Sequence, residues 1–224
     1  MKFTVVDDVL KLGVKVAIIT IRGMNNAMDN MDFNRYAIDT IREMKNNLTI
    51  SNIENDSILN GFWTLHENIG KTSKHDIPSP VALLTMLLTT EGMPNINLIV
   101  DIYNLVSLKT RLSLGAHDIT KINGNVTLKI AEGTEEFLPI GYTHSKKISK
   151  GEYAYIDDAN DVLCRMEVKQ VEKTKVTEAT TDCLYIIQGN ANTTNEQIKE
   201  AIDMLSDLTT KYCGGNTEII YQTW

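Results

Sequence analysis

The sequence contains no long apolar run, and this absence limits where the protein can act. No stretch of its 224 residues approaches the roughly 20 apolar residues that a membrane-spanning helix needs. The opening residues, MKFTVVDDVLK, place two acids where a signal peptide has its apolar segment. We therefore expect a cytoplasmic protein that does not use a membrane as a partner.

Cysteines are scarce as well. Cys164, Cys183 and Cys213 lie far apart and form no C-x-x-C pair, which favours buried free thiols over a disulfide framework.

The G-x-x-x-x-G-K-[ST], G-x-G-x-x-G and G-x-S-x-G motifs are missing, so a phosphate-binding loop and a nucleophile elbow are excluded. The four histidines show no metal-ligand spacing, and we expect neither a metal nor a cofactor.

Basic side chains are outnumbered by acidic ones. The formal net charge is −7, which argues against DNA or any other polyanion as a nonspecific partner, because phosphate binding needs concentrated Lys and Arg. The imbalance is strongest in residues 181–224, whereas residues 101–180 are nearly balanced. A polyanion would therefore have to bind the middle of the chain.

The pattern of apolar residues predicts an α+β fold, a layered β-sheet and helix domain. Helices are grouped between runs of strands rather than alternating with them, which argues against a doubly wound parallel sheet. Strands are predicted at residues 2–6, 14–21, 126–130, 136–140, 153–156, 162–169, 183–187 and 218–223. Helices are predicted at residues 32–45, 57–69, 81–90 and 97–112, and after a capping box formed by Thr193 and Glu196.

We expect a single domain over residues 1–224 with three parts. These are an N-terminal strand and helix lobe (1–74), a core (75–190) and a C-terminal helix and strand (191–224), and the polar stretch Lys71–Asp76 is the predicted boundary of the lobe. The helix at 81–90 is apolar nearly all round and is expected to be buried. In the strand that begins at Val162, apolar residues alternate with mainly polar ones, so one of its faces should be buried and the other exposed to solvent.

The helix predicted at 97–112 carries the most informative pattern. Asn97, Asp101, Asn104 and Arg111 fall within one arc of an otherwise apolar helix. Polar groups in such a position need hydrogen-bond partners. They are satisfied either by structural hydrogen bonds or by a ligand in a pocket, and the pattern leaves both alternatives open.

The same segment carries a resemblance to a known family. Val100–Asn104 and then Gly115–Asp118 resemble the V-D-x-T-N … H-A-F-D stretch of the phenylalanyl-tRNA synthetase beta chain. The similarity continues through Tyr155–Asp158 into Gln170–Thr180 and covers roughly residues 78–189. It extends to freestanding relatives of the editing domain, the third and fourth domain of that chain.

The resemblance implies a fold like that editing domain and a pocket that hydrolyses the ester of a mischarged tRNA. The implied partners are the tRNA 3′ end or an aminoacyl-tRNA, and an amino acid. Such a reaction needs a positioned water, donors for the oxyanion and recognition of the amino-acid side chain, and it does not need a nucleophilic Ser or Cys.

Three residues are candidates for catalysis under this resemblance. Asn104 matches the pocket Asn of the family, which implies that it orients substrate or water. Glu172 lies where the family has a Glu that senses the misloaded side chain, with a solvated loop charge as the alternative. His117 lies two positions after the family's pocket His and is the candidate to replace it, with a surface or capping role as the alternative.

Five further residues are candidates for substrate binding. Tyr103 replaces the family's Thr, and Gly115 replaces its pocket His, which puts the selected amino acid in question. Lys173 and Lys175 flank Glu172 and are expected to meet phosphate. Asp101 is either part of the pocket or, like Asp118, a cap that braces the turn.

Two functions follow from these observations. The first is a trans-acting aminoacyl-tRNA editing hydrolase, and the second is a noncatalytic module that binds tRNA or an amino acid. A complete phenylalanine–tRNA ligase is excluded in either case, because the chain carries no ATP-binding catalytic region.

Overall fold

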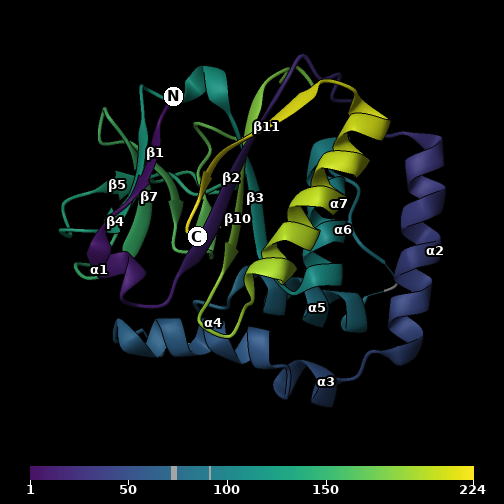
Figure 1. The fold of residues 1–224 in the computed structure, drawn as a ribbon, viewed down its shortest axis with the longest axis horizontal. Helices are drawn as coiled ribbons and strands as arrows, with labels where there is room; N and C mark the ends of the chain where they lie inside the picture. Colours follow the sequence, from purple (N-terminus) through teal and green to yellow (C-terminus); the bar gives the residue numbers. More distant parts are fainter. Residues whose placement is uncertain (72–74, 91) are drawn as a thin grey trace.

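The computed structural model describes residues 1–71, 75–90 and 92–224. Two β-sheets pack against each other, and helices α6 (Leu98–Thr110) and α7 (Asn195–Cys213) cover the outer face of one of them (Figure 1). The expected α+β architecture is therefore present. No helix in the described part of the chain is long and apolar enough to cross a membrane.

The sheet under α6 and α7 has four antiparallel strands. Its order is β11–β2–β10–β3, with β2 at Lys15–Arg22, β3 at Ser113–Asp118, β10 at Cys183–Gly189 and β11 at Asn216–Gln222. The central strands β2 and β10 are rich in Ile and Val and are buried on both faces, as expected for strands covered by helices on one side and a sheet on the other.

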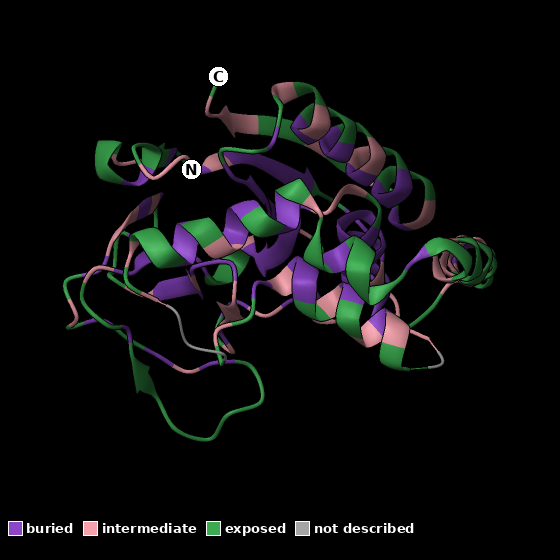
Figure 2. Ribbon diagram, turned by 90° about the horizontal axis from the view of Figure 1, so that it is seen from below, coloured by how far each residue is buried: buried purple, intermediate pink, exposed green. Residues whose placement is uncertain are grey.

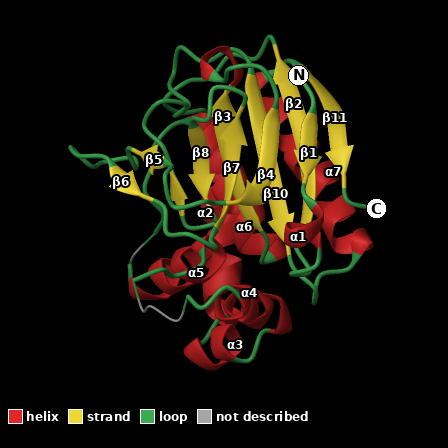
Figure 3. Cartoon of the chain, turned by 90° about the vertical axis from the view of Figure 1, so that its left-hand side faces the viewer, coloured by secondary structure: helices red, strands yellow, loops and turns green. Residues whose placement is uncertain are grey.

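The second sheet has five strands in the order β1–β4–β7–β8–β9. Their bounds are Phe3–Val5, Val126–Ile130, Tyr153–Asp157, Val162–Arg165 and Lys169–Gln170. Strand β1 runs parallel to β4, and the other pairs are antiparallel. A separate pair, β5 (Glu136–Phe137) and β6 (Lys146–Lys147), projects away from this sheet (Figure 3).

The remaining helices surround the sheets at their ends and flank. Helix α2 (Met31–Asn47) stands beside α6 and α7 and is largely exposed, since Phe33 is its one buried residue (Figures 1 and 2). Helices α4 (Ser57–Asn68) and α5 (Ser79–Thr89) pack below the strands (Figure 3). The described residues also form three short helices, α1 (Asp7–Leu10), α3 (Ile50–Glu54) and η1 (Ile119–Lys121).

The sequence pattern missed strand β3. No strand was predicted between the helix ending at residue 112 and the strand beginning at residue 126, yet Ser113–Asp118 forms the edge of the four-stranded sheet and pairs with β10. Its residues Leu-Gly-Ala-His contain no β-branched side chain, so local propensity gives no strand signal. Burial against the second sheet forms the strand in spite of this composition.

Three local predictions were wrong in detail. Helix α5 buries only one face, with Val81, Leu84 and Leu87 in the core. Strand β8 ends at Arg165 because the next residue, Met166, has a positive φ of 50°, so the predicted alternation stops and Glu167 is buried instead of wet. The capping box of α7 lies one residue further along the chain than predicted.

The predicted division of the single domain into a lobe, a core and a C-terminal part stays a prediction, and the main hydrophobic core extends across all three parts. Its largest cluster joins residues of β1, β2 and α4 to residues of α6, α7 and β10. Part of the expected boundary, residues 72–74, lies outside the described residues.

Candidate functional site

A small cavity lies between the two sheets, and we call it the interlayer cavity. Residues of β3 and β10 line it from one sheet and residues of β7, β8 and β9 from the other, and its volume is about 60 Å³. That volume holds a few water molecules, whereas pockets for small organic ligands measure roughly 300–1,000 Å³. Its polar lining residues are Ser79, Ser113, His117, Tyr155, Glu167, Lys169, Gln170 and Gln188.

The imidazole of His117 is part of the cavity wall and is only 1% exposed. Its Nδ1 shares a hydrogen bond of 2.8 Å with the hydroxyl of Thr174, and its Nε2 has no hydrogen-bond partner within the described residues. Burial lowers the pKa of His117 to about 4, so the ring is neutral near pH 7. Its Nε2 is therefore a buried polar atom whose hydrogen-bonding capacity is left unused by the described residues.

Gly115 lies two residues before His117, and a neighbouring side chain fills the space that it leaves. A Cβ atom at this position would lie 2.5 Å from Nε2 of Gln170. The side chain of Gln170 also lies beside buried Tyr103, and burial raises the pKa of that tyrosine far above its usual range. Tyr103 and Gly115 are thus brought together, but Gln170, which the sequence did not single out, closes the space between them.

The cavity wall also includes a buried carboxylate with several partners. Glu167 is 4% exposed and is bonded to His66 Nε2 and to the hydroxyl of Tyr153. Gln188 donates to Glu167 at 3.3 Å and accepts a hydrogen bond of 2.5 Å from Tyr155. Burial and the charge of Glu167 raise the pKa of Tyr153. This network links both sheets. It was not predicted from the sequence, because Glu167 was expected to lie on the solvent-exposed face of the strand.

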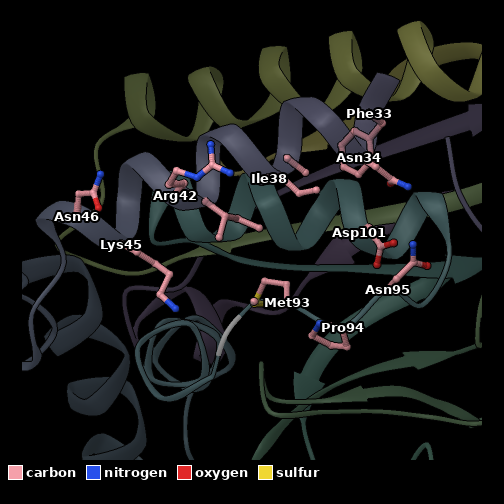
Figure 4. A pocket seen from close by; sticks show the side chains of 13 residues that line it. Phe33, Asn34, Ile38, Arg42, Lys45, Asn46, Met93, Pro94, Asn95 and Asp101 are labelled. Carbon is pink, nitrogen blue, oxygen red and sulfur yellow. The ribbon is translucent and has the colours of Figure 1, made fainter. Parts of the chain in front are cut away.

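Asn104 and Asp101 lie on a different side of α6 from Tyr103. Asn104 lines a space of about 20 Å³ between α6 and α2, and Asp101 lines both this space and a larger groove beside it (Figure 4). Successive residues of an α-helix point about 100° apart, which separates Tyr103 from Asn104. The structure therefore does not bring Asn104 to the interlayer cavity.

The loop after β9 places Glu172 at the surface. Glu172 forms an ion pair with Lys175, and this hydrogen bond and the charge of Lys175 lower the pKa of Glu172. Lys173 pairs with Asp161. Glu172, Lys173 and Lys175 therefore have partners within the chain, and none of them lines the interlayer cavity. Two residues of this loop meet His117: Thr174 through its hydroxyl, and Lys175 through a backbone β-bridge.

A basic surface lies beside this cavity on residues 136–150, which we call the basic hairpin. Its Tyr142 is 42% exposed, and Nζ of Lys146 lies 4.0 Å from the centre of the tyrosine ring. Lys169, which lines the interlayer cavity, reaches the same ring at 5.7 Å. Lys147 and Lys150 are also exposed. An aromatic residue within a basic segment is a sequence pattern typical of nucleic-acid binding, but it was not among the predicted site residues.

Comparisons with known proteins agree on the fold. The family model described as the B3/4 domain matches residues 65–214, more than half of the chain. The crystal structure of an N-terminal fragment of the phenylalanyl-tRNA synthetase beta-subunit from Pyrococcus horikoshii superposes with a TM-score of 0.51 and 16% identity. The match covers 96% of this chain and 50% of that chain, so this chain spans half the length of that fragment. No curated protein matches significantly.

Proposed function

Because this chain belongs to the B3/4 domain family, we propose that it binds the single-stranded 3′ end of a tRNA on the basic hairpin. The observation that carries the proposal is the exposed ring of Tyr142 with Lys146 on one side and the cavity residue Lys169 nearby. The expected function is therefore recognition of an RNA end, in keeping with the resemblance to a tRNA-editing domain.

The chemistry of the basic hairpin suits a single strand. Proteins bind unpaired nucleotides by stacking bases on aromatic side chains, which contributes about 1–3 kcal/mol per base, and by placing lysines along the phosphates. The segment from Tyr142 to Lys150 contains three lysines and no acid. Such a local concentration of charge offsets the net charge of −7 for a ligand that contacts only this surface.

Recognition without hydrolysis is the function that the geometry supports best. The interlayer cavity of about 60 Å³ is too small for an amino acid joined to adenosine, because Gln170 occupies the space next to Gly115. Two of the three candidate catalytic residues, Asn104 and Glu172, lie outside the cavity.

The binding proposal is tested with an RNA hairpin that ends in the unpaired tRNA 3′ sequence, by fluorescence anisotropy. Tyr142→Ala should weaken binding about fivefold or more, the loss of one stacked base. Lys146→Glu should also weaken it, whereas Lys11→Glu, an equal charge change at a lysine that is 74% exposed just after α1, should not. Affinity should fall steeply between 50 and 200 mM salt.

Two results would reject this proposal. One is equal affinity of Lys146→Glu and Lys11→Glu, and the other is binding that does not change with salt. A blunt duplex of the same sequence serves as the ligand control, because it offers no unpaired base to Tyr142.

Hydrolysis of an aminoacyl ester is the second candidate function, and one observation favours it. His117 presents a neutral ring with an unpartnered nitrogen in the cavity wall. For this nitrogen to act on an ester, the side chain of Gln170 has to leave the space beside Gly115. The candidate residues Asn104 and Glu172 would then act only after a larger rearrangement.

Deacylation of a panel of mischarged tRNAs tests this second function. We expect His117→Ala to abolish any activity, Gln170→Ala to raise it by opening the cavity, and Asn104→Ala and Glu172→Ala to leave it unchanged. Wild-type rates at the uncatalysed background would reject hydrolysis while leaving RNA binding to be judged by anisotropy.

A further inference from the structure

A second cavity, larger than the interlayer cavity, lies away from it. It is a groove of about 570 Å³ between α2, the segment 92–95 and the N-terminal half of α6, and we call it the α2–α6 groove (Figure 4). Its volume falls within the range of about 300–1,000 Å³ that is typical of small-molecule sites. The small space beneath Asn104 shares five of its lining residues and extends it toward α6.

One end of the groove carries a carboxyl group that lacks a cation. Asp101 is half-buried, accepts a hydrogen bond of 3.1 Å from the backbone N–H of Ile96, and forms no ion pair within the described residues. Burial raises the pKa of Asp101 to about 6. The side chains of Asn34 and Asn95 lie near it (Figure 4). A ligand that brings a positive charge to this end would stabilise the ionised carboxylate.

The opposite end carries positive charge, and the middle is apolar. Arg42 and Lys45 of α2 line the groove there; Arg42 forms an exposed pair with Asp39, and Lys45 donates to a backbone carbonyl. Between the two ends lie Met93 and Ile38, whose side chain is 55% exposed. The groove therefore has a negative end, an apolar floor and a positive end.

We infer that the α2–α6 groove binds a short peptide with free ends. Its ammonium group lies at Asp101, its apolar side chains lie over Ile38 and Met93, and its carboxylate lies at Arg42 and Lys45. This site is independent of the RNA surface, because the basic hairpin contributes no residue to it.

The length of the groove fits a peptide of three or four residues. Asn34 and Arg42 are eight residues apart on α2, which corresponds to about 12 Å at 1.5 Å per residue. An extended peptide spans about 3.3–3.6 Å per residue. A single amino acid is too short to reach both charged ends.

The test uses the tripeptide Ala-Leu-Ala and isothermal titration calorimetry. With free ends it should bind at pH 7, N-acetylation should weaken binding about tenfold by removing the charged hydrogen bond to Asp101, and C-terminal amidation should weaken it less. Asp101→Asn keeps the acceptor for Ile96 and should reproduce the effect of acetylation. Asp203→Asn, an exposed change on α7, is the matched control and should leave binding unchanged.

Affinity of the free tripeptide should also weaken as the pH falls from 7 to 5, because Asp101 then takes up a proton. Within the described residues, the charged side chains that line the groove with Asp101 are Arg42 and Lys45 at its far end. On α6 the buried hydroxyl of Tyr103 also interacts with Asp101, and burial raises the pKa of Tyr103 far above this pH range. Segment 92–95 has no titratable side chain.

Three outcomes would overturn the inference. They are no binding of the free tripeptide at millimolar concentration, equal binding of the acetylated tripeptide, and an unchanged affinity for Asp101→Asn. None of them bears on RNA binding by the basic hairpin, which is measured separately.

Discussion

The interlayer cavity and the α2–α6 groove each contain a titratable side chain whose pKa is shifted by burial, but only the groove has room for a ligand. Burial favours the neutral form in both, lowering the pKa of His117 to about 4 and raising that of Asp101 to about 6. The first site measures about 60 Å³ and the second about 570 Å³. In the interlayer cavity, Gln170 fills the space beside Gly115. The α2–α6 groove has an outer wall formed by α2, a helix that stands apart from the sheets (Figure 1).

The difference shows that residues adjacent in a motif need not share a site. Tyr103 and Asn104 are neighbours in the segment that resembles the synthetase, yet one contacts Gln170 and the other lines the space under α2. Because α6 is covered by other elements on nearly all sides, polar residues on its different faces lie in separate cavities. Four substitutions test this contrast.

Glu167→Ala should have the largest effect, a loss of about 3–5 kcal/mol in the free energy of unfolding. The change leaves His66, Tyr153 and Gln188 buried without their shared acceptor. Urea unfolding at pH 7 measures it. The control is Glu172→Ala, which breaks only an exposed ion pair and should cost less than about 1 kcal/mol. Similar losses for both variants would mean that the interlayer network contributes no special stability.

His117 should make stability depend on pH. Its pKa falls from 6.5 in the unfolded chain to about 4 in the folded one, so the unfolded state binds more protons in between. The stabilisation is complete above pH 6.5 and decreases toward pH 4 by up to about 3 kcal/mol. His117→Gln should flatten this decrease, measured by unfolding at several pH values. His144→Gln, an exposed control, should retain the wild-type profile.

Gly115→Ala should cost about 1–2 kcal/mol, because the new methyl group would lie 2.5 Å from Nε2 of Gln170 and displace that side chain from its packed position. Adding Gln170→Ala should recover part of this loss, a coupling that a double-mutant cycle measures by thermal unfolding. Gly92→Ala, at the rim of the groove, has no atom within 4 Å of the new Cβ and should change stability by less than about 0.5 kcal/mol. Equal changes in stability at both glycines would mean that Gln170 does not pack tightly against Gly115.

Asp101→Asn should have the smallest effect and the opposite sign. The folded pKa of Asp101, about 6, lies above the unfolded value of 3.8, so its stabilising effect is complete below 3.8 and is lost as the pH rises through 6. At pH 7 the variant should be more stable than the wild type by about 1 kcal/mol, a figure reduced for screening in the open groove. At pH 3.5 the two should be equal. A difference that persists at pH 3.5 would point to packing instead of charge.

Much of the fold was predictable from the sequence because its main elements follow simple periodicities. The β-branched runs became β2 and β10, and the apolar stripe beginning near Ile198 became the buried face of α7. Strand β3 was not predictable, because a Leu-Gly-Ala-His segment has low strand propensity and becomes a strand only through burial. The turn at Met166 was missed for a related reason, since positive φ is unusual for Met.

The candidate site was less accessible to sequence reasoning. The polar arc on α6 was recognised, and Asn97 proved to be its N-cap, but the arc alone does not reveal which neighbouring element each residue meets. Gln170 and Gln188 carried no signal, because their roles arise from contacts between residues far apart in the chain. The assignments of Asn104, His117 and Glu172 to catalysis stay predictions that only the deacylation assay can test.

The pairing of β2 with β11 also constrains how the chain is made. Ile21 of β2 lies opposite Thr217 of β11, so their contact joins residues almost two hundred positions apart. At synthesis rates of about 5–20 residues per second, β2 leaves the ribosome roughly 10–40 s before its partner does. For most of that interval both edges of an Ile-rich strand lack their partners, because its other neighbour, β10, is also synthesised late. Nascent protein at this stage should therefore depend on a chaperone more than the finished fold does.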